Sequence, residues 1–218
     1  MTPAAIIFGS IGTLVETSEI QRDAFNEAFR EAGLDWEWDR ASYQEMLRAA
    51  GGRDRIGVYA KERGETVDAA ALHARKTEIF DDRMRAEGLA LRDGVSDVLD
   101  WGARTGTPVA FASTTSRANI DAMMDAVDGL RDRLAFVADA SMVERVKPDP
   151  EVYALACEKL GVLPEDCIGI EDTEVNLAAP RAAGLVAVAF PGANSGGQDF
   201  SAAALVTDRL DPAAFADL

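Results

Sequence analysis

Histidine and cysteine are scarce in this chain of 218 residues, which has one histidine and two cysteines. Cys157 and Cys167 lie ten positions apart, and that spacing matches no common zinc-ligand pattern, so we interpret them as reduced thiols rather than a lone disulfide. His73 falls in the middle of a predicted helix, where packing is the more common role. No cysteine or serine nucleophile motif accompanies it, so the sequence offers no catalytic triad.

Positive charge is also in short supply, with 22 Lys and Arg against 38 Asp and Glu and a net charge of −16. A field of that sign repels nucleic acid and anionic membranes, so we expect neither as a partner. No apolar run approaches the ~20 residues of a membrane span. Residues 1–8 are too few for a signal peptide and lead straight into a turn. These features together predict a cytoplasmic protein. We expect it to be a monomer or a weak homodimer.

Strand and helix patterns are unevenly distributed along the chain. The first strand, residues 4–8, is continuously apolar, as expected for a strand buried on both faces of a parallel sheet. Residues 17–88 contain only helical patterns, at 18–33, 39–50, 54–63 and 67–86. Beyond Gly88, helices alternate with strands at 108–112, 134–137, 167–170, 186–190 and 204–206. The order predicts an α/β fold with a doubly wound parallel sheet: a core of residues 1–16 and 89–218, and an inserted all-helical cap of residues 17–88.

Polar residues follow several of these strands, at the edge where such sheets bind ligands. They are the hydroxyl run 113–116, Lys147, and the acidic pair Glu171 and Asp172. Each has an ordinary interpretation by itself, as a helix cap or a surface charge. Their joint occurrence at strand ends indicates a site for a phosphate and a divalent cation.

The segment Phe8-Gly9-Ser10-Ile11-Gly12-Thr13-Leu14 resembles the first motif, Phe-Asp-x-Asp-Gly-Thr-Leu, of haloacid dehalogenase superfamily members with a small helical cap. The hydroxyl of the second motif falls on Ser113, the lysine of the third on Lys147, and the acids of the fourth on Glu171 and Asp172. The resemblance covers almost the whole chain. Segments 51–56, 112–116 and 197–200 are most similar to the xylulose-1,5-bisphosphate phosphatases of carbon-fixing bacteria and to the related β-phosphoglucomutases.

The resemblance implies a specific chemistry and also a defect in it. In that family the first motif aspartate attacks phosphorus, the aspartate two residues later transfers protons, and Mg²⁺ offsets the negative charges. Gly9 stands at the nucleophile position and Ile11 at the acid/base position, so neither catalytic group is intact. Mg²⁺ binding is then expected to be weakened and to depend on Asp172, with Glu171 as a second candidate ligand.

Recognition of a phosphorylated sugar is expected to survive these losses. The candidate phosphate-binding residues are Ser113, Thr114, Lys147, Gly12 and Thr13. The candidate substrate contacts of the hinge and cap are Glu16, Gln21, where related enzymes carry histidine, and Arg53. Gly9 is expected to leave open space, and Lys147 could instead have its charge offset by Asp172. Ser10 is expected to point to the wrong face for a nucleophile, because strand side chains alternate.

Three functions remain open on the sequence alone. The first is a hydrolase of this family by descent that lacks, or nearly lacks, phosphatase activity and binds a phosphorylated sugar. The second is an active metal-dependent hydrolase that uses Asp172 or Glu171 with a metal-bound water. The third is a non-catalytic scaffold for interactions.

Overall fold

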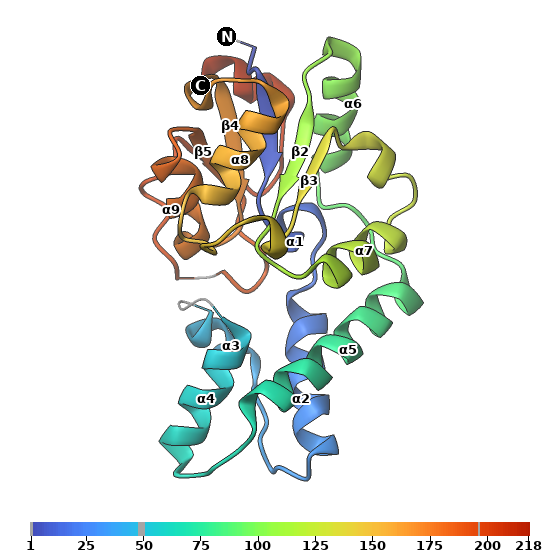
Figure 1. Cartoon of the computed structure of the whole chain (residues 1–218), viewed down its shortest axis with the longest axis vertical. Helices are drawn as coiled ribbons and strands as arrows, with labels where there is room; N and C mark the ends of the chain where they lie inside the picture. Colours follow the sequence, from blue (N-terminus) through green and yellow to red (C-terminus); the bar gives the residue numbers. More distant parts are fainter. Residues whose placement is uncertain (1, 48–50, 196) are drawn as a thin grey trace.

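A six-stranded parallel sheet forms the centre of the computed structural model, which describes residues 2–47, 51–195 and 197–218. The strand order is β3-β2-β1-β4-β5-β6, and Figure 1 shows the blue strand β1 between β2 and β4. The strands are β1 (Ala5–Phe8), β2 (Val109–Ala112), β3 (Phe136–Ala138), β4 (Cys167–Glu171), β5 (Val186–Ala189) and β6 (Leu205–Val206). The predicted α/β class and parallel sheet are confirmed.

Side chains of β1 alternate between two apolar layers, because successive strand residues face opposite sides of a sheet. Ala5 and Ile7 belong to the cluster that includes α8 (Glu151–Leu160) and part of α9 (Glu174–Ala182). Ile6 and Phe8 belong to the cluster that includes α6 (Val95–Thr105) and α7 (Arg117–Ala126). All four β1 side chains are fully buried. The continuous apolar pattern therefore reflects a central strand covered by helices on both faces.

The strand register brings distant segments to one edge of the sheet. Phe8, the last residue of β1, pairs with Phe111 of β2 on one side and with Ile170 of β4 on the other. The residues that follow these strands therefore emerge side by side. The chain reverses its direction of winding between β1 and β4, and open α/β sheets bind ligands at such a switch point.

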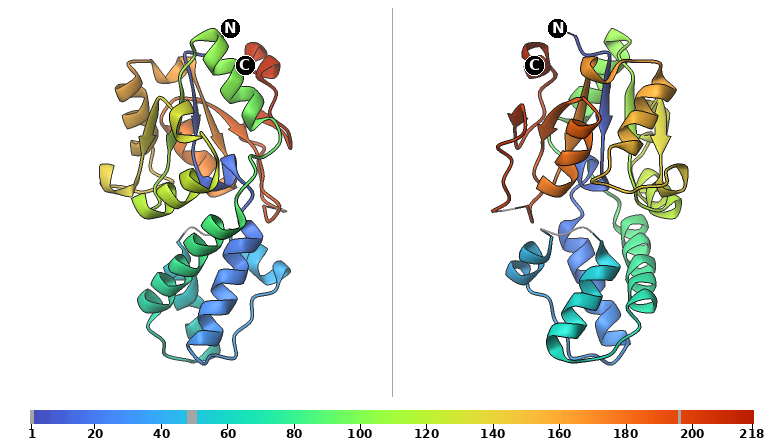
Figure 2. Two further views of the ribbon diagram at one scale, coloured as in Figure 1. Left: turned by 90° about the vertical axis from the view of Figure 1, so that its right-hand side faces the viewer. Right: turned by 60° about the vertical axis from the view of Figure 1, so that its left-hand side comes forward.

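Four helices lie below this edge in Figures 1 and 2. They are α2 (Ser18–Glu31), α3 (Arg40–Met46), α4 (Gly52–Arg63) and α5 (Ala69–Glu87). An aromatic cluster that includes Phe25, Phe29, Trp36, Trp38 and Tyr43 fills the space between them. The helix predicted at 39–50 corresponds to α3, which ends at Met46, and residues 48–50 of the prediction lie outside the described part of the chain.

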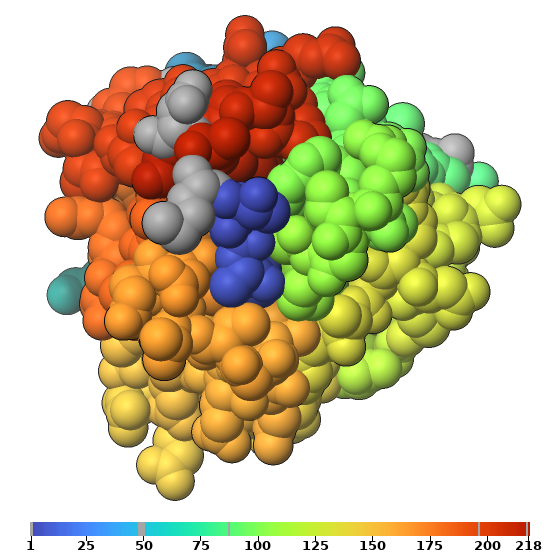
Figure 3. Space-filling model, turned by 90° about the horizontal axis from the view of Figure 1, so that it is seen from above, coloured from blue at the N-terminus to red at the C-terminus, as the bar shows by residue number. Residues whose placement is uncertain are grey.

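Several short helices were not predicted. α1 (Ile11–Leu14) follows β1 directly, and the 3-10 helices are Arg131–Arg133, Ala140–Met142, Pro164–Asp166 and Pro212–Asp217. Seen from the end opposite the four helices, the N-terminal segment lies between α6 and the C-terminal segment (Figure 3). Among the helices that the structure describes, none combines the length and the apolar character needed to span a bilayer.

Candidate functional site

A cleft of about 420 Å³ lies between the strand ends and the four helices. Its walls combine residues from segments that are far apart in the sequence. From the sheet side come Gly9, Ser10, Ile11, Gly12, Ser113, Thr114, Lys147 and Asp172, and from the helical side Gln21, Arg55, His73 and Lys76. The predicted motif residues of three strand ends therefore do converge on one cavity.

Gly9 does not leave open space in this cleft, contrary to the sequence prediction. A β-carbon at this position would lie 2.0 Å from the Tyr153 hydroxyl oxygen and 2.1 Å from Glu171 Oε1. Both of these side chains are fully buried. The Tyr153 hydroxyl donates a hydrogen bond to Glu171 Oε1 at 2.9 Å. The volume that a side chain at position 9 would need is thus filled by a phenol and a carboxylate.

Lys147 is paired with Glu171, and not with Asp172 as the sequence suggested. Its ammonium donates to Glu171 Oε1 and to the backbone carbonyl of Gly9, and lies 4.9 Å from the centre of the Tyr153 ring. The lysine is 6% exposed and the glutamate 0%. The two charges therefore compensate each other in a medium that screens them poorly. Part of the positive charge that would attract a phosphate is therefore already neutralised by Glu171.

Ser10 and Asp172 form a second polar pair at the bottom of the cleft. The Ser10 hydroxyl donates to Asp172 Oδ1 at 2.8 Å. The predicted orientation of Ser10 was wrong, because Ser10 follows β1 as the residue that precedes α1 and strand alternation no longer applies to it. Burial, together with the charge of Glu171, raises the pKa of Asp172 to about 6. The hydrogen bond from Ser10 and the charge of Lys147 act in the opposite direction.

The acidic residues at the strand ends differ in whether they are available to a Mg²⁺ ion. Within residues 2–47, 51–195 and 197–218, no three acidic, histidine or cysteine side chains converge as metal ligands would. Glu171 Oε1 is committed to Lys147 and Tyr153. Glu171 Oε2 has no hydrogen-bond partner among the described residues, yet the side chain is enclosed and has no exposed surface. Among the described residues that line the cleft, Asp172 provides the one carboxylate, so a Mg²⁺ ion held there would take its other oxygens from water, backbone carbonyls or a phosphate.

Some of the predicted phosphate-binding residues line the cleft, and one of them is buried away from it. Ser113 and Thr114 both line the cleft, and the Ser113 hydroxyl accepts a bond from the Thr115 amide at 3.2 Å. Gly12 also lines the cleft. Thr13 is fully buried, and its amide and hydroxyl both donate to the carbonyl of Ser10. The Thr13 amide is therefore already used inside the turn.

Arg92 supports the loop after β1, a role that sequence reasoning missed. Its guanidinium donates to the carbonyls of Gly12 at 2.6 Å, Phe190 at 2.9 Å and Pro191 at 2.6 Å. It also stacks 3.5 Å from the centre of the Phe190 ring. Burial lowers the pKa of Arg92. No local pattern signals this role, since the three carbonyls come from segments about 80 to 99 residues away.

The helical side of the cleft is cationic, but its arginine is not the predicted one. Arg53 is exposed and pairs with Asp54 at 3.6 Å, and it does not line the cleft. Arg55, two residues later, does line it and donates to the Met46 carbonyl at 3.1 Å. Position along a helix decides this, because residues two apart point to different faces.

Gln21 and Lys76 form the remaining part of the helical wall. The Lys76 ammonium nitrogen lies 3.1 Å from Gln21 Oε1. Lys76 is 5% exposed, and burial lowers its pKa to about 7. Gln21 was predicted as a substrate contact and lines the cleft. Lys76 and His73 were not assigned to the site from the sequence, although both line it.

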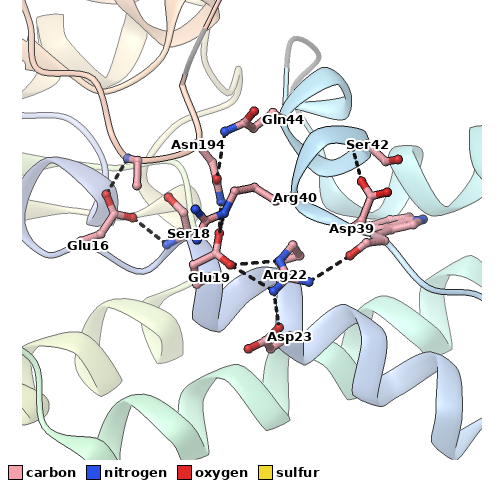
Figure 4. A network of polar contacts seen from close by, with 12 residues as sticks. Glu16, Ser18, Glu19, Arg22, Asp23, Asp39, Arg40, Ser42, Gln44 and Asn194 are labelled. Atoms are coloured by element: carbon pink, nitrogen blue, oxygen red, sulfur yellow. Dashed lines mark hydrogen bonds and ion pairs between the residues drawn. The ribbon is translucent and has the colours of Figure 1, made fainter.

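Glu16 is turned towards a core loop instead of the cleft. Its carboxylate accepts from the Ser18 amide at 2.9 Å and from the Ala193 amide at 2.8 Å (Figure 4). Next to it, Asn194 donates to Glu19 Oε1 at 2.8 Å and accepts from Gln44 at 3.3 Å. These bonds tie residues 193–194 of the core to α2 and α3, so Glu16 belongs to a contact between the two parts of the chain.

The family model described as haloacid dehalogenase-like hydrolase matches residues 3–184. The chain belongs to this haloacid dehalogenase-like hydrolase family. Among curated relatives, the plasmid-encoded protein CbbY of Cupriavidus necator is 40% identical over 96% of this chain and 87% of its own length. The fructose-1-phosphate phosphatase YqaB of Escherichia coli is 30% identical over 85% of this chain and 95% of its own. This hydrolase therefore lies in a sugar-phosphate phosphatase branch of the family that includes CbbY.

Solved structures agree with this placement. CbbY from Rhodobacter sphaeroides in complex with phosphate is 36% identical and superposes with a TM-score of 0.84, covering 95% of this chain and 94% of the other. A mutant of that CbbY has been solved with xylulose-1,5-bisphosphate, with the same identity, coverage and TM-score. At 20% identity, the β-phosphoglucomutase of Clostridium difficile shares the fold of this hydrolase, with a TM-score of 0.78, covering 99% of this chain and 96% of the other.

Proposed function

We propose that this haloacid dehalogenase-like hydrolase binds a phosphorylated sugar in the cleft and does not use the aspartyl-phosphate route of its family. The observation that carries the proposal is the environment of Gly9. No carboxylate is present at position 9, and the space for one is taken by Tyr153 and Glu171. Ile11, at the acid/base position, is 7% exposed and belongs to the apolar cluster of the core. Neither position can attack phosphorus or transfer a proton.

Hydroxyl and nitrogen groups on both sides of the cleft support ligand binding. Ser113 and Thr114 bring hydroxyl groups, and Arg55 and Lys76 bring nitrogen groups from the helical side. These groups work against the repulsion expected from a net charge of −16. The R. sphaeroides CbbY structures with phosphate and xylulose-1,5-bisphosphate make a sugar bisphosphate the first ligand to test.

A thermal-shift screen of sugar mono- and bisphosphates, with and without Mg²⁺, tests the binding part. A ligand at 100 times its dissociation constant adds about 2.7 kcal/mol to the free energy of unfolding, which is easily measured. Ser113→Ala should weaken the shift. The distant exposed variant Ser201→Ala is the matched control, because Ser201 lies outside the cleft. Absence of a shift with every compound would favour the scaffold interpretation.

A rescue experiment tests the chemical part. Gly9→Asp with Ile11→Asp puts carboxylates back at both positions. The carboxylate at position 9 would collide with Tyr153 and Glu171, and the carboxylate at position 11 would place a charge in an apolar cluster. We therefore expect the double variant to remain inactive on sugar phosphates, and activity to require further changes that remove both colliding groups, the hydroxyl of Tyr153 and the carboxylate of Glu171. Phosphatase activity of the double variant alone would contradict this account of the filled site.

A second candidate function is a hydrolase that uses Asp172 as a general base. One observation favours it, because a cleft carboxylate with a pKa of about 6 suits proton transfer near neutral pH. Glu171 is excluded from a direct role by its enclosure under Lys147. The assay is turnover of sugar phosphates with and without added Mg²⁺. Activity lost in Asp172→Asn but kept in Glu174→Gln, a neighbouring acid outside the cleft lining, would support it.

A further inference from the structure

Asn194, in the core loop after β5, joins two helices of the helical side on one flank of the cleft. In Figure 1 α3 lies on the left, whereas α7 and the adjoining end of α5 lie on the right. The amide nitrogen of Asn194 donates to Glu19 Oε1 of α2 at 2.8 Å, and its amide oxygen accepts from Gln44 of α3 at 3.3 Å (Figure 4). Glu19 is itself held by Arg22 at 3.0 Å and by Arg40 at 3.2 Å.

These two bonds require the carboxamide of asparagine. A carboxamide provides both a donor and an acceptor, whereas an ionised carboxylate provides acceptors only. Asn194 is 1% exposed, so water does not reach it while the contact is formed. Its side chain is therefore fixed by α2 and α3 at once, although it does not itself line the cleft.

The next residue of the loop reaches the cleft directly. The Ser195 hydroxyl donates to the backbone carbonyl of Asp172 at 2.7 Å, and both residues line the cleft. On the facing wall, Tyr43 precedes Gln44 in α3 and also lines the cleft. Because neighbouring loop residues contact both walls, the bonds of Asn194 set how far α3 stands from Asp172.

The connections on the other flank are of a different kind. Val15 and Leu91, where the chain passes between the core and the helices, form a single antiparallel bridge. α5 packs against α7, and Phe80 and Met123 of these helices belong to one buried apolar cluster. Separating apolar surfaces exposes them to water, which is unfavourable, whereas the bonds of Asn194 can be exchanged for bonds to water at a small net cost. The cleft should therefore open on the flank of Asn194.

We propose that Asn194 is a latch that holds α3 against the core before any ligand is bound. Breaking its bonds to Glu19 and Gln44 then sets the rate at which a ligand enters and leaves the cleft. The inference rests on the proposed function for the nature of that ligand, a phosphorylated sugar. It gives Asn194 a role in access and none in chemistry.

Access to the cleft can be measured without a ligand. Ser113→Cys places a thiol on the cleft wall, at a position that is 4% exposed, and the two native cysteines are buried. Alkylation by iodoacetamide, followed by peptide mass mapping, then reports how often the cleft opens. Adding Asn194→Asp replaces the donating amide by an oxygen that faces the Glu19 carboxylate. Labelling at position 113 should become about tenfold or more faster.

Further variants in the same Ser113→Cys background show whether the effect belongs to this contact. Glu19→Gln combined with Asn194→Asp exchanges donor and acceptor and should return labelling most of the way to the slow rate. Asn26→Asp makes the same charge change at a residue that bonds the Trp38 backbone at 3.0 and 2.8 Å on the helical side, and should leave labelling unchanged. Asn194→Ala removes the bonds without adding charge and should also speed labelling, so it replaces Asn194→Asp if circular dichroism shows that variant to be unfolded.

The outcomes separate the latch from the proposed function. Labelling that is not accelerated by either change at Asn194 refutes the latch, and so does an equal acceleration by Asn26→Asp. Binding is measured separately, as the melting temperature of the wild-type protein with sugar phosphates. If these compounds bind and labelling is not accelerated, the proposed function stands and the latch is refuted. If labelling is accelerated and no sugar phosphate binds, the latch stands and the phosphorylated sugar is refuted as its ligand.

Discussion

Replacing Gly9 by alanine tests directly whether Tyr153 and Glu171 fill the space beside Gly9. The substitution adds one methyl group and no charge. Its carbon would lie 2.0 Å from the Tyr153 hydroxyl oxygen, 2.1 Å from Glu171 Oε1 and 2.5 Å from Glu171 Cδ. Real β-carbons do not approach other atoms this closely, so at least one of these side chains must move. Neither has exposed surface into which it can move freely.

The expected cost follows from overpacking. Inserting a methyl group into a well-packed site costs about 1–3 kcal/mol. Displacement of Tyr153 would also break its 2.9 Å bond to Glu171, whose other oxygen already lacks a partner among the described residues. For a domain of this size 1 kcal/mol corresponds to about 2–4 °C, so the melting temperature should fall by about 2–12 °C.

The assay is urea unfolding followed by circular dichroism, with thermal melting as a second measurement. Gly57→Ala is the matched control, because Gly57 lies in α4 with nothing within 4 Å of the added carbon. Alanine in a helix interior should stabilise by about 0.5–1 kcal/mol relative to glycine. Tyr153→Phe combined with Gly9→Ala should recover part of the loss. An unfolding midpoint for Gly9→Ala at or above that of the wild type would refute the inference that Tyr153 and Glu171 fill the space beside Gly9.

Three further predictions concern the charges around the cleft. Asp172 has a folded-state pKa of about 6 against 3.8 for an ordinary aspartate, so its ionised form costs about 3 kcal/mol of stability. This cost appears as the pH rises from about 4 to 6. The urea midpoint of Asp172→Asn should therefore rise relative to that of the wild type over this range, and the difference should then stay constant. A difference that does not change with pH would contradict the raised pKa of Asp172. Lys147→Met should destabilise by about 3–5 kcal/mol by leaving the buried Glu171 unpaired. Adding Glu171→Gln should recover most of that loss in the same assay, and no recovery would show that Lys147 acts otherwise. Arg92→Ala should lower the free energy of unfolding by about 1.5–3 kcal/mol, because three carbonyls lose their charged donor. A melting temperature equal to that of the wild type would contradict the role of Arg92 in supporting the loop after β1.

Local patterns predicted the architecture well because they report burial and backbone conformation directly. The apolar run at residues 4–8 became the central strand β1, and the helix predicted at 54–63 does end at Arg63, followed by Gly64 with left-handed backbone. The ends of the helices predicted at 18–33, 54–63 and 67–86 differ from the observed ends by at most two residues, and short elements such as α1 were not predicted. A single turn has too few residues to show a periodic pattern.

The residues alone show that both motif aspartates are absent, and their order predicts that Ser113, Lys147 and Asp172 follow strand ends of one sheet. The sequence could not predict that Tyr153 and Glu171 occupy the place beside Gly9, that Lys147 is neutralised by Glu171, or that Lys76 faces the cleft. These contacts join residues that are far apart along the chain. Strand and helix patterns depend on near neighbours, whereas these partners are 18 to 162 residues apart, and only packing selects which of many polar groups meet.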